Sequence, residues 1–420
     1  MLRIVVGGVA LLLAGIVTAA APAEQNQAAD PLEAAWSGYI DSLNQAREAL
    51  VGSGFFEGET VRAEAYRYLA GLVSLNNTRY LYFGDPAFPR FFPVVSPESD
   101  SSYSNPDTYY LAARISDQYA YRITGRLGTV NQTTIGTYAF TEKPDQDLSK
   151  TLAGPRATER SLKTDANGHF ELVISRQKMP AQNWLGMIEG ATSITIYQIH
   201  GDWQKERKGQ FHIERIGAEG LPPPAETELS VAGKLGEAGM RTRDMVNYWL
   251  DRARQRHRMP ENSMGEPRII QVASYGSYFA AGRYAVPAGK ALIIEFPEPP
   301  GSSYWGWTLY NPWGQMLDFS NRQTSLNMAQ AVPDADGKYR LVLAAEDPGT
   351  ANWLDTAGHP SGALNWRVTS EKAPAVPVMR LVSLVDLQRS LPKGTAYLSA
   401  EERRARLALR QRAAAERFVD

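Results

Sequence analysis

The sequence contains no cysteine among its 420 residues. This absence excludes a disulfide framework, a thiolate metal site and a lipid-bearing cysteine behind an export signal. The folded chain must therefore be stabilised by its own packing, and a chain of this length is long enough to bury a sizeable core. Because a single core rarely grows beyond about 250–300 residues, we expect two domains.

An excess of charge of one sign is also missing. The 44 Lys and Arg residues nearly balance the 45 Asp and Glu residues, which gives a formal net charge of −1. A chain without a global basic field does not attract the phosphate backbone of DNA or RNA. We therefore expect no nucleic-acid partner.

Long apolar runs are missing after the N-terminus. The segment from Met1 to about Ala23 has a positive start at Arg3, an apolar run at Ile4–Val17 and small residues at Val17–Ala23. The run is shorter than the roughly 20 residues that a membrane-spanning helix needs, and the order of these features is that of a signal peptide. We predict export to the periplasm or the exterior, with a signal at 1–23 and no integral membrane segment after its removal. An uncleaved anchor is the alternative.

Signatures of common catalytic and cofactor sites are missing as well. The sequence has no G-x-x-x-x-G-K-[ST] loop, no G-x-G-x-x-G after a strand, no G-x-S-x-G elbow and no H-E-x-x-H spacing. We therefore predict no cofactor and no metal. Calcium held by Asp334 and Asp336 is the alternative for that segment, although the same pattern at Asp165 and Asn167 is typical of a plain hairpin turn.

The hydrophobic pattern changes from helical to strand-like near residue 80. Apolar residues recur three and four apart at 60–75, as on one face of a helix. Beyond Leu81, short runs rich in Tyr, Ile, Val and Thr are separated by Gly, Pro and Asn, which is typical of sandwiches and barrels. The predicted strands are Tyr109–Ile115, Tyr119–Gly125, Thr133–Phe140, His169–Ser175, Ser193–Ile199, Phe211–Ile216, Arg268–Val272, Ala291–Phe296, Tyr304–Tyr310, Lys338–Ala344, Leu364–Thr369 and Met379–Leu384.

These patterns divide the chain behind the signal into five parts. The glycines at 233, 236 and 239 weaken the first half of the helix predicted between the β domains, so its firm part is 241–257. The last helix carries six arginines between 403 and 417, which could contact an anionic membrane surface, but its glutamates and thin apolar face favour a solvated or packed helix. The parts are N-terminal helices at 31–79, a first β domain at 80–218, a bridging helix at 225–260, a second β domain at 265–388 and a C-terminal helix at 399–420.

The chain resembles itself at a shift of 169 residues. Asn183-Trp184-Leu185 falls on Asn352-Trp353-Leu354, and a D-x-(N/D)-G turn precedes an alternating strand in both copies. We therefore expect a mainly β, α+β protein with two related β-sandwich-like domains from an internal duplication. Further matches are Phe170, Leu172 and Ile174 on Tyr339, Leu341 and Leu343, Tyr197 on Trp366, and Tyr110 and Arg114 on Phe279 and Arg283.

What the two copies share predicts structure. We expect Trp184 and Trp353 to close one end of each sandwich core, with stacking on a ligand as the alternative for Trp353. We expect Asn183 and Asn352 to bond loop backbone. Arg283 has a twin in Arg114, which favours a structural ion pair.

What the copies do not share indicates function. After Asn-Trp-Leu the first copy continues with 186–190, Gly-Met-Ile-Glu-Gly, while the second reads Asp355-Thr-Ala-Gly-His359. Asp355, Thr356 and His359 are therefore candidate site residues on a loop. The alternative is a hydrogen-bond set within the loop, since Asp side chains commonly accept backbone N–H groups in turns.

Four segments of the second β domain resemble a known family. They are Tyr304–Tyr310, Asn321–Asn327, Asp334–Gly337 and Asp347–Gly362, and they are similar to domain of unknown function 1214. The segments Asn105–Tyr110 and Tyr121–Gly125 resemble the N-terminal part of the same proteins, which is related to domain of unknown function 1254. The likeness runs from about Ala63 to the tail. It implies paired β-sandwiches with added helices, often in bacteria, and it implies no activity and no catalytic residues.

Two functions from different classes are consistent with these residues. The first is binding of a small organic, glycan or lipid-like ligand at the aromatic-rich second β domain, with Thr356, Arg322, Arg367, Tyr310 and Trp353 in contact with it. Trp305 and Trp307 share one strand face, which we assign to the core, while Tyr304, Thr308 and Tyr310 share the other. The alternative is a hydrolase or lyase that uses Asp355 and His359 as an acid–base pair, because an imidazole titrates near neutral pH.

Overall fold

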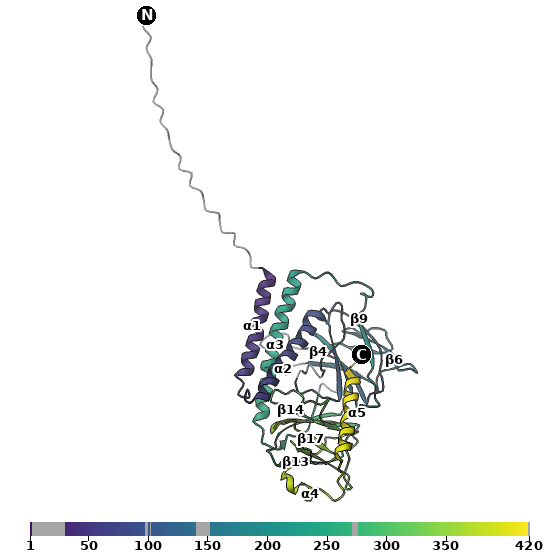
Figure 1. Ribbon diagram of the computed structural model, residues 1–420. Coiled ribbons are helices and arrows are strands. Elements are labelled where there is room, and N and C mark those ends of the chain that lie inside the picture. The colour runs from purple at the N-terminus through teal and green to yellow at the C-terminus, as the bar shows by residue number, and fades with distance from the viewer. Residues whose placement is uncertain (2–29, 97–99, 101, 140–151, 271–275, 419–420) are drawn as a thin grey trace.

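The computed structural model describes Met1 and residues 30–96, 100, 102–139, 152–270 and 276–418. The protein is mainly β, with two sandwich-like halves and helices along their sides (Figure 1). The predicted signal peptide lies outside the described residues except for Met1. Among the described helices, none combines the length and the apolar composition that crossing a bilayer requires. The α-helices are α1 (Pro31–Val51), α2 (Glu59–Asn76), α3 (Glu228–His257), α4 (Leu387–Ser390) and α5 (Ala400–Phe418); a π-helix follows α2 at Asn77–Tyr82, and a 3-10 turn precedes α4 at Leu384–Asp386.

The first half is built from two sheets that enclose one core. Their orders are β1-β2-β8-β4-β5 and β7-β6-β3-β9. Alternate residues of the facing strands, such as Ile123, Leu172 and Ile196, point into the core between the sheets. The strands are β1 (Phe92–Pro93), β2 (Thr108–Arg114), β3 (Tyr121–Arg126), β4 (Gln132–Ala139), β5 (Leu152–Thr158), β6 (His169–Ser175), β7 (Trp184–Gly186), β8 (Ser193–Ile199) and β9 (Gln210–Arg215).

The second half repeats this topology. Its sheets are β10-β12-β18-β14-β15, with β11 also paired to β12, and β17-β16-β13-β19. Trp305, Trp307 and Trp366 lie fully buried in the core between them, which confirms the assignment of Trp305 and Trp307. The strands are β10 (Ser263–Met264), β11 (Arg268–Ile269), β12 (Ser277–Ala285), β13 (Lys290–Pro297), β14 (Tyr304–Tyr310), β15 (Ser325–Asn327), β16 (Lys338–Ala344), β17 (Trp353–Asp355), β18 (Ser361–Thr369) and β19 (Val378–Ser383).

The strand orders confirm the internal duplication. β6 and β16 begin 169 residues apart, and each pairs in parallel with a short strand, β7 or β17, in the same register. Asn183 accepts from Lys163 N and donates to the carbonyls of Lys163 and Glu171. Asn352 does the same at Val332 and Arg340. The predicted role of both asparagines is therefore confirmed.

One of the predicted matches is wrong. Trp366 lies in the second core, whereas Tyr197 packs edge-on against Tyr110 and Tyr138 and is not part of the first core. The core positions of β8 are Ile194 and Ile196, and those of β18 include Leu364 and Trp366. Corresponding residues of β8 and β18 thus lie 170 positions apart and not 169, so the duplication does not keep the same shift in every strand.

The helix between the halves lies within the predicted bounds of 225–260, and it is regular well before the part predicted as firm, 241–257. α3 is continuous from Glu228, and a reciprocal capping box between Thr227 and Ser230 satisfies its first backbone N–H groups. Gly239 lets α1 approach, since a Cβ there would lie 3.0 Å from the Cα of Tyr39. α1 and α3 lie side by side in Figure 1. The glycines that lower helix propensity therefore lie in a helix that packing stabilises.

The twin arginines attach α3 to both halves. Arg114 of β2 forms an ion pair with Glu237 on α3 at 3.8 Å. Arg283 of β12 donates to the carbonyl of His257, at the end of α3, at 2.9 Å and pairs with Glu261 at 3.1 Å. The structural role predicted for Arg283 is confirmed.

The first half covers the outer face of the sheet that contains β14. Tyr304 donates to Asp107 at 2.6 Å, and Tyr310 donates to the carbonyl of Ser104 at 2.5 Å. A Cβ on Gly306 would lie 2.6 Å from the carboxylate of Asp107. The tyrosine face of β14 is therefore buried against residues 102–107 and does not line an open pocket.

Candidate functional site

The loop between β17 and β18 is held by the side chain of Asp355. One of its carboxylate oxygens accepts from the backbone N–H of Ala357 at 2.7 Å, and the other accepts from Arg322 at 2.9 Å. Ala357 adopts a left-handed φ of 50°, which this bond helps to hold. Asp355 is 6% exposed and Arg322 is 53% exposed, so the pair joins the interior to the surface. Asp355 therefore has the structural role within the loop that was the alternative to a direct functional role.

His359 is paired with a residue that sequence reasoning missed. Its Nε2 lies 3.0 Å from Oε1 of Glu64, which is on α2, and both side chains are largely buried. The bonds of Asp355 go to Arg322 and Ala357 instead. The predicted Asp355–His359 acid–base pair is therefore not formed, and Glu64 is the carboxylate next to the imidazole. No signal in the sequence connects two residues that lie 295 positions apart.

Tyr284 of β12 lies beside the same carboxylates. Burial, and then the charges of Glu64 and Asp355, raise the pKa of its phenol above its usual range. A Cβ on Gly362 would lie 2.6 Å from the hydroxyl, so a glycine is needed there. Among the described residues, the Tyr284 hydroxyl, Oε2 of Glu64 and the Thr356 hydroxyl have no hydrogen-bond partner. We call Glu64, Tyr284, Arg322, Asp355, Thr356 and His359 the loop cluster.

Arg367 and Tyr310, two further predicted site residues, belong to the contact between the halves. Arg367 donates to the Tyr310 hydroxyl at 2.9 Å and also to the carbonyl of Tyr103. Neither side chain has a bond to Arg322, Asp355 or His359 in the described structure. The predicted ligand-contacting residues therefore divide into two groups.

Trp353 has a structural role that differs from both predicted ones. Its indole lies on the outer face of β17, in a cluster with Ile293, with Leu387 of α4 and with Leu391, which follows α4. The ring N–H donates to the carbonyl of Ala344 at 2.9 Å, and Arg403 stacks over the ring. The prediction that Trp353 closes the end of the sandwich core is wrong because Leu354, the next residue, points into that core instead.

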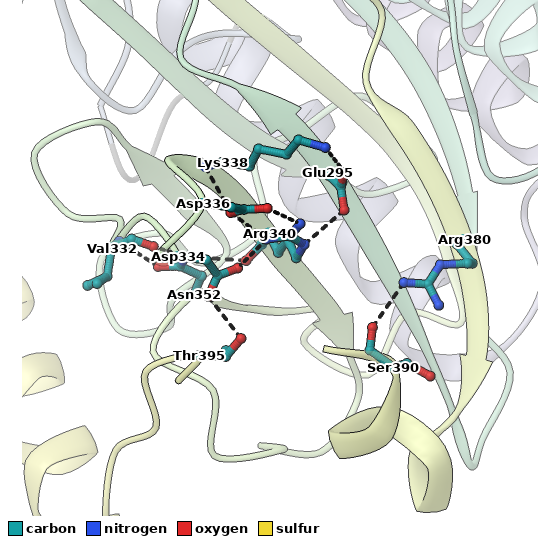
Figure 2. Close-up of polar contacts among 10 residues, drawn as sticks. All are labelled: Glu295, Val332, Asp334, Asp336, Lys338, Arg340, Asn352, Arg380, Ser390 and Thr395. Carbon is teal, nitrogen blue, oxygen red and sulfur yellow. Dashed lines mark hydrogen bonds and ion pairs between the residues drawn. The ribbon is translucent and has the colours of Figure 1, made fainter. Parts of the chain in front are cut away.

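The carboxylates of Asp334 and Asp336 are bonded to Arg340 (Figure 2). The guanidinium contacts both at 2.8 Å, and its Nε contacts Glu295 at 2.8 Å. Gly337 has the left-handed φ of the predicted turn. In the described part of the chain, no group of three His, Asp or Glu residues could hold a metal ion.

Asp107 is the centre of a buried polar network between the halves. It accepts from Tyr304 at 2.6 Å, from Trp203 at 2.8 Å and from Asn327 at 2.9 Å. Burial raises the pKa of its carboxyl, although these donors and the charge of Arg417 oppose the shift. The network binds residues of both halves to one carboxylate, so its role is to fix their relative position.

The C-terminal helix docks through arginines spaced seven residues apart. Arg403 pairs with Asp347 at 2.9 Å, Arg410 bonds Ser325 and the carbonyl of Phe319, and Arg417 stacks over Trp203. Residues seven apart lie on one face of a helix. The helix is therefore packed against the protein, which was one of the alternatives to contact with a membrane surface.

A groove of about 510 Å³ runs along α5. Ligand pockets typically measure about 300–1,000 Å³, so the groove has the size for a small molecule. Its floor includes Trp203 and Leu326, and its wall on α5 includes Ala405, Leu409 and Ala413. The groove lies between the second half, the helix and the turn at 202–205 of the first half. The other lining residues are Asp202, Gln204, Lys205, Gln323, Ala329, Gln330, Leu398, Glu402, Arg406, Leu407 and Arg410.

The fold and these sites define a protein of two duplicated β-sandwiches joined by a bridging helix and closed by an arginine-docked helix. Residues 281–372 match the model of a family described as protein of unknown function, DUF1214. The resemblance of the second β domain is thereby confirmed. No curated protein matches the chain.

Two solved structures of bacterial proteins are among those that match this chain. An uncharacterized protein from Burkholderia cenocepacia is 29% identical, with a TM-score of 0.78 over 84% of this chain and 98% of that one. The VPA0106 protein from Vibrio parahaemolyticus is 11% identical, with a TM-score of 0.41 over 82% of this chain and 100% of that one. The first likeness supports the two-sandwich architecture over nearly the whole chain.

Proposed function

We propose that this protein is exported and binds a small organic or lipid-like molecule in the groove along α5. The observation that carries the proposal is the groove itself, which is of ligand size and is lined by eight apolar side chains and eight polar or charged ones. The signal-like segment at 1–23 supports export. The apolar residues on the wall formed by α5, Leu407 and Leu409, favour a ligand with an apolar part.

The groove moves the proposed site away from the residues that the sequence indicated. The tyrosine face of β14 is buried against the first half, and Trp353 is covered by Arg403. Gln323 connects the two regions, because its amide donates to the carbonyls of Ala351 and Trp353 and it also lines the groove.

A substitution that fills the groove tests the proposal. Ala405 is exposed and lines the groove, so Ala405→Trp should obstruct it without disturbing the core. Ala408→Trp is the matched control, since Ala408 is exposed on the same helix and does not line the groove. A thermal-shift screen of fatty acids, alcohols, sterols and oligosaccharides should give at least one compound that stabilises the native protein and the control but not Ala405→Trp. A stabilising compound that acts equally on all three proteins would contradict binding in the groove.

We propose a hydrolase or lyase as the second candidate, and the loop cluster supports it with different partners from those first predicted. The specific observation is that His359 is paired with Glu64 next to the buried hydroxyl of Tyr284. A carboxylate that orients an imidazole, with a phenol nearby, is suited to proton transfer. Turnover of an ester or glycoside library that is lost in both Glu64→Gln and His359→Gln, at unchanged thermal stability, would support it. Equal turnover in the variants and the native protein would exclude it.

We also propose that the N-terminal half is related to domain of unknown function 1254. The likeness of Asn105–Tyr110 and Tyr121–Gly125 supports this relation. These segments include Asp107 and Tyr110, which lie at the contact between the halves, and Tyr121, which is buried in the first core. If the N-terminal half is related to that domain, the residues that the two share include some at the contact between the halves and some in the core of this half.

A further inference from the structure

The charged residues of the α5 groove are unequally paired. Asp202 forms an ion pair with Lys205 at 3.0 Å, and Glu402 accepts from the backbone N–H of Ser399 at 2.7 Å. The two arginines of the wall, Arg406 and Arg410, have no carboxylate within 4.0 Å in the described part of the chain. The anionic side chains of the groove thus have partners of their own, while neither arginine forms a direct ion pair; Glu402 acts on Arg406, and Asp107 and Asp318 act on Arg410, only through their more distant charges.

The guanidinium groups of these arginines bond neutral oxygens. Arg406 donates to the carbonyl of Ala351 at 3.1 Å. Arg410 donates to the carbonyl of Phe319 at 2.5 Å and to the carbonyl and hydroxyl of Ser325 at 3.2 and 2.6 Å. A guanidinium has five N–H donors, so these bonds leave donors on both residues, and most of those of Arg406, for another acceptor.

Burial makes this positive charge costly. It lowers the pKa of Arg410 to about 10, and the pKa of Arg406 is lowered by burial and then by the neighbouring charge of Arg403. An anion beside them would offset this cost, because charge-assisted bonds to a guanidinium are stronger than bonds between neutral groups. Carboxylates and phosphates match the planar fork of an arginine.

Eight of the sixteen side chains that line the groove are apolar, and some of them adjoin the arginines. Trp203 and Leu326 are buried in its floor, and Leu407 and Leu409 belong to the same wall as Arg406 and Arg410. A ligand that fills such a site needs an apolar body beside its charged end. A fully polar anion would leave the leucines facing water, and an uncharged apolar molecule would leave the arginines without a direct anionic partner.

We propose that the occupant of the groove is an amphipathic anion, a chain-like molecule whose acidic head binds Arg406 and Arg410 and whose apolar body lies along Leu326, Leu407 and Leu409. This inference rests on the proposed binding function and names the chemical class of its ligand. The head group is a carboxylate or a phosphate, both of which have the oxygen geometry that a guanidinium binds.

Four probes with the same ten-carbon chain test the class. They are decanoate, decyl phosphate, decan-1-ol and decyltrimethylammonium, each titrated calorimetrically into the full-length mature protein below the concentration at which it forms micelles. We expect at least one of the two anions to bind at least about tenfold more tightly than the alcohol, which corresponds to one charge-assisted contact, and the cation to bind most weakly. The better of the two anions identifies the head group.

Two variants test the contact. Arg406→Gln should weaken binding of the preferred anion by about tenfold or more and leave the affinity for decan-1-ol unchanged. Arg404→Gln is the matched control, because it removes the same charge from an exposed position outside the groove and should change neither affinity by more than about twofold. Both variants retain Arg403 and Arg410, which dock the helix.

The outcomes separate the two proposals. Equal affinities for the anions and decan-1-ol, or an anion affinity that Arg406→Gln leaves unchanged, would overturn the anionic class while the groove remained a binding site. If none of the four probes binds, the proposal of an amphipathic anion is wrong. Binding in the groove is then tested separately by the thermal-shift screen, in which a compound should stabilise the native protein but not Ala405→Trp.

Discussion

At the scale of single residues, Glu64 and His359 join a helix near the N-terminus to a loop of the second half. Their side-chain atoms lie 3.0 Å apart, and both residues are largely shielded from water. Shielded pairs differ from surface pairs because a partner left behind loses both its bond and its solvation. The pair therefore couples α2 to the loop between β17 and β18, which no β-sheet pairing connects.

A double-mutant cycle should detect this coupling. We expect Glu64→Gln and His359→Gln to show an interaction energy of about 1–3 kcal/mol in urea unfolding, since residues that share a hydrogen bond are not additive. The control is the exposed pair Asp165 and His169, whose side chains are 53% and 59% exposed and whose coupling should stay below about 0.5 kcal/mol. Additive effects at Glu64 and His359 would show that the contact contributes nothing to stability.

His200 gives the protein a pH-dependent stability. It is fully buried, and neither ring nitrogen has a hydrogen-bond partner among the described residues. Burial, and then the charge of Arg417, lower its pKa to about 3. An unfolded histidine has a pKa of about 6.5, so between these values the unfolded state binds a proton that the folded state does not. Stability should therefore fall as the pH decreases from 6.5 towards 3.

Comparison with a variant that lacks the imidazole isolates this effect. Between pH 7 and pH 5 the free energy of unfolding of the native protein should fall by about 2 kcal/mol more than that of His200→Leu, as expected for one proton bound by the unfolded state only. The measurement is urea unfolding at several pH values. Parallel pH profiles of the two proteins would mean that the folded state protonates His200 as readily as the unfolded one.

At the scale of elements, α5 is held by polar contacts more than by apolar ones. Arg403 contacts Asp347, the carbonyl of Thr350 and the amide oxygen of Gln323. Its removal leaves these acceptors unpaired at a buried surface. A helix with a thin apolar face depends on such contacts because it buries little hydrocarbon.

Arg403→Met should loosen this helix. We expect a loss of about 3 kcal/mol in the stability of the docked helix, within the range for breaking a buried ion pair, and faster hydrogen exchange at 400–418. Arg404→Met, at an exposed position of the same helix, should change stability by no more than about 0.5 kcal/mol. Equal protection in the two variants would show that Arg403 does not dock α5.

The elements with strong local patterns were those that the sequence predicts well. The strands His169–Ser175, Ser193–Ile199, Tyr304–Tyr310 and Lys338–Ala344 have exactly the predicted bounds, because their alternation and flanking turns are local properties. β12 is missing from the prediction because it carries Ala280, Ala281 and Gly282, which are weak strand formers. Its place in the sheet comes from pairing with β18 over nine residue pairs. The predicted strand at 268–272 is shorter, and its last two residues lie outside the described ones.

The candidate site was less accessible to prediction than the fold. Comparison of the two copies correctly predicted the backbone bonds of Asn183 and Asn352, because a role shared by both copies belongs to the architecture. It could not find Glu64, which lies outside the duplicated region, and it could not indicate that α5 would form the wall of a groove. Contacts between residues that are far apart in one sequence leave no local pattern.

At the scale of the whole molecule, Asp107 connects the halves. Trp203 donates to it from the first half, and Tyr304 and Asn327 donate to it from the second. The carboxylate is 2% exposed, so water cannot replace a lost partner. The halves should therefore unfold together and not as independent units.

Asp107→Ala should weaken this connection. We expect a stability loss of about 3 kcal/mol or more, because three buried donors lose their acceptor. Calorimetry should show one transition for the native protein and a broader or divided one for the variant. Asp386→Ala, which removes an exposed carboxylate from a 3.8 Å pair with Arg389, is the control and should cost no more than about 0.5 kcal/mol. An unchanged single transition in Asp107→Ala would place the connection elsewhere.

The attachment of both halves to α3 has a mechanical consequence. A helix of 30 residues is about 45 Å long at 1.5 Å per residue, and it is stiff over that length. Arg114 holds it at Glu237, and Arg283 holds it at its last residue, twenty positions further along. The helix therefore connects the two sandwiches rigidly at Arg114 and Arg283, which are equivalent positions in the two halves. A displacement of one sandwich along the helix axis would therefore displace the other, whatever the groove along α5 contains.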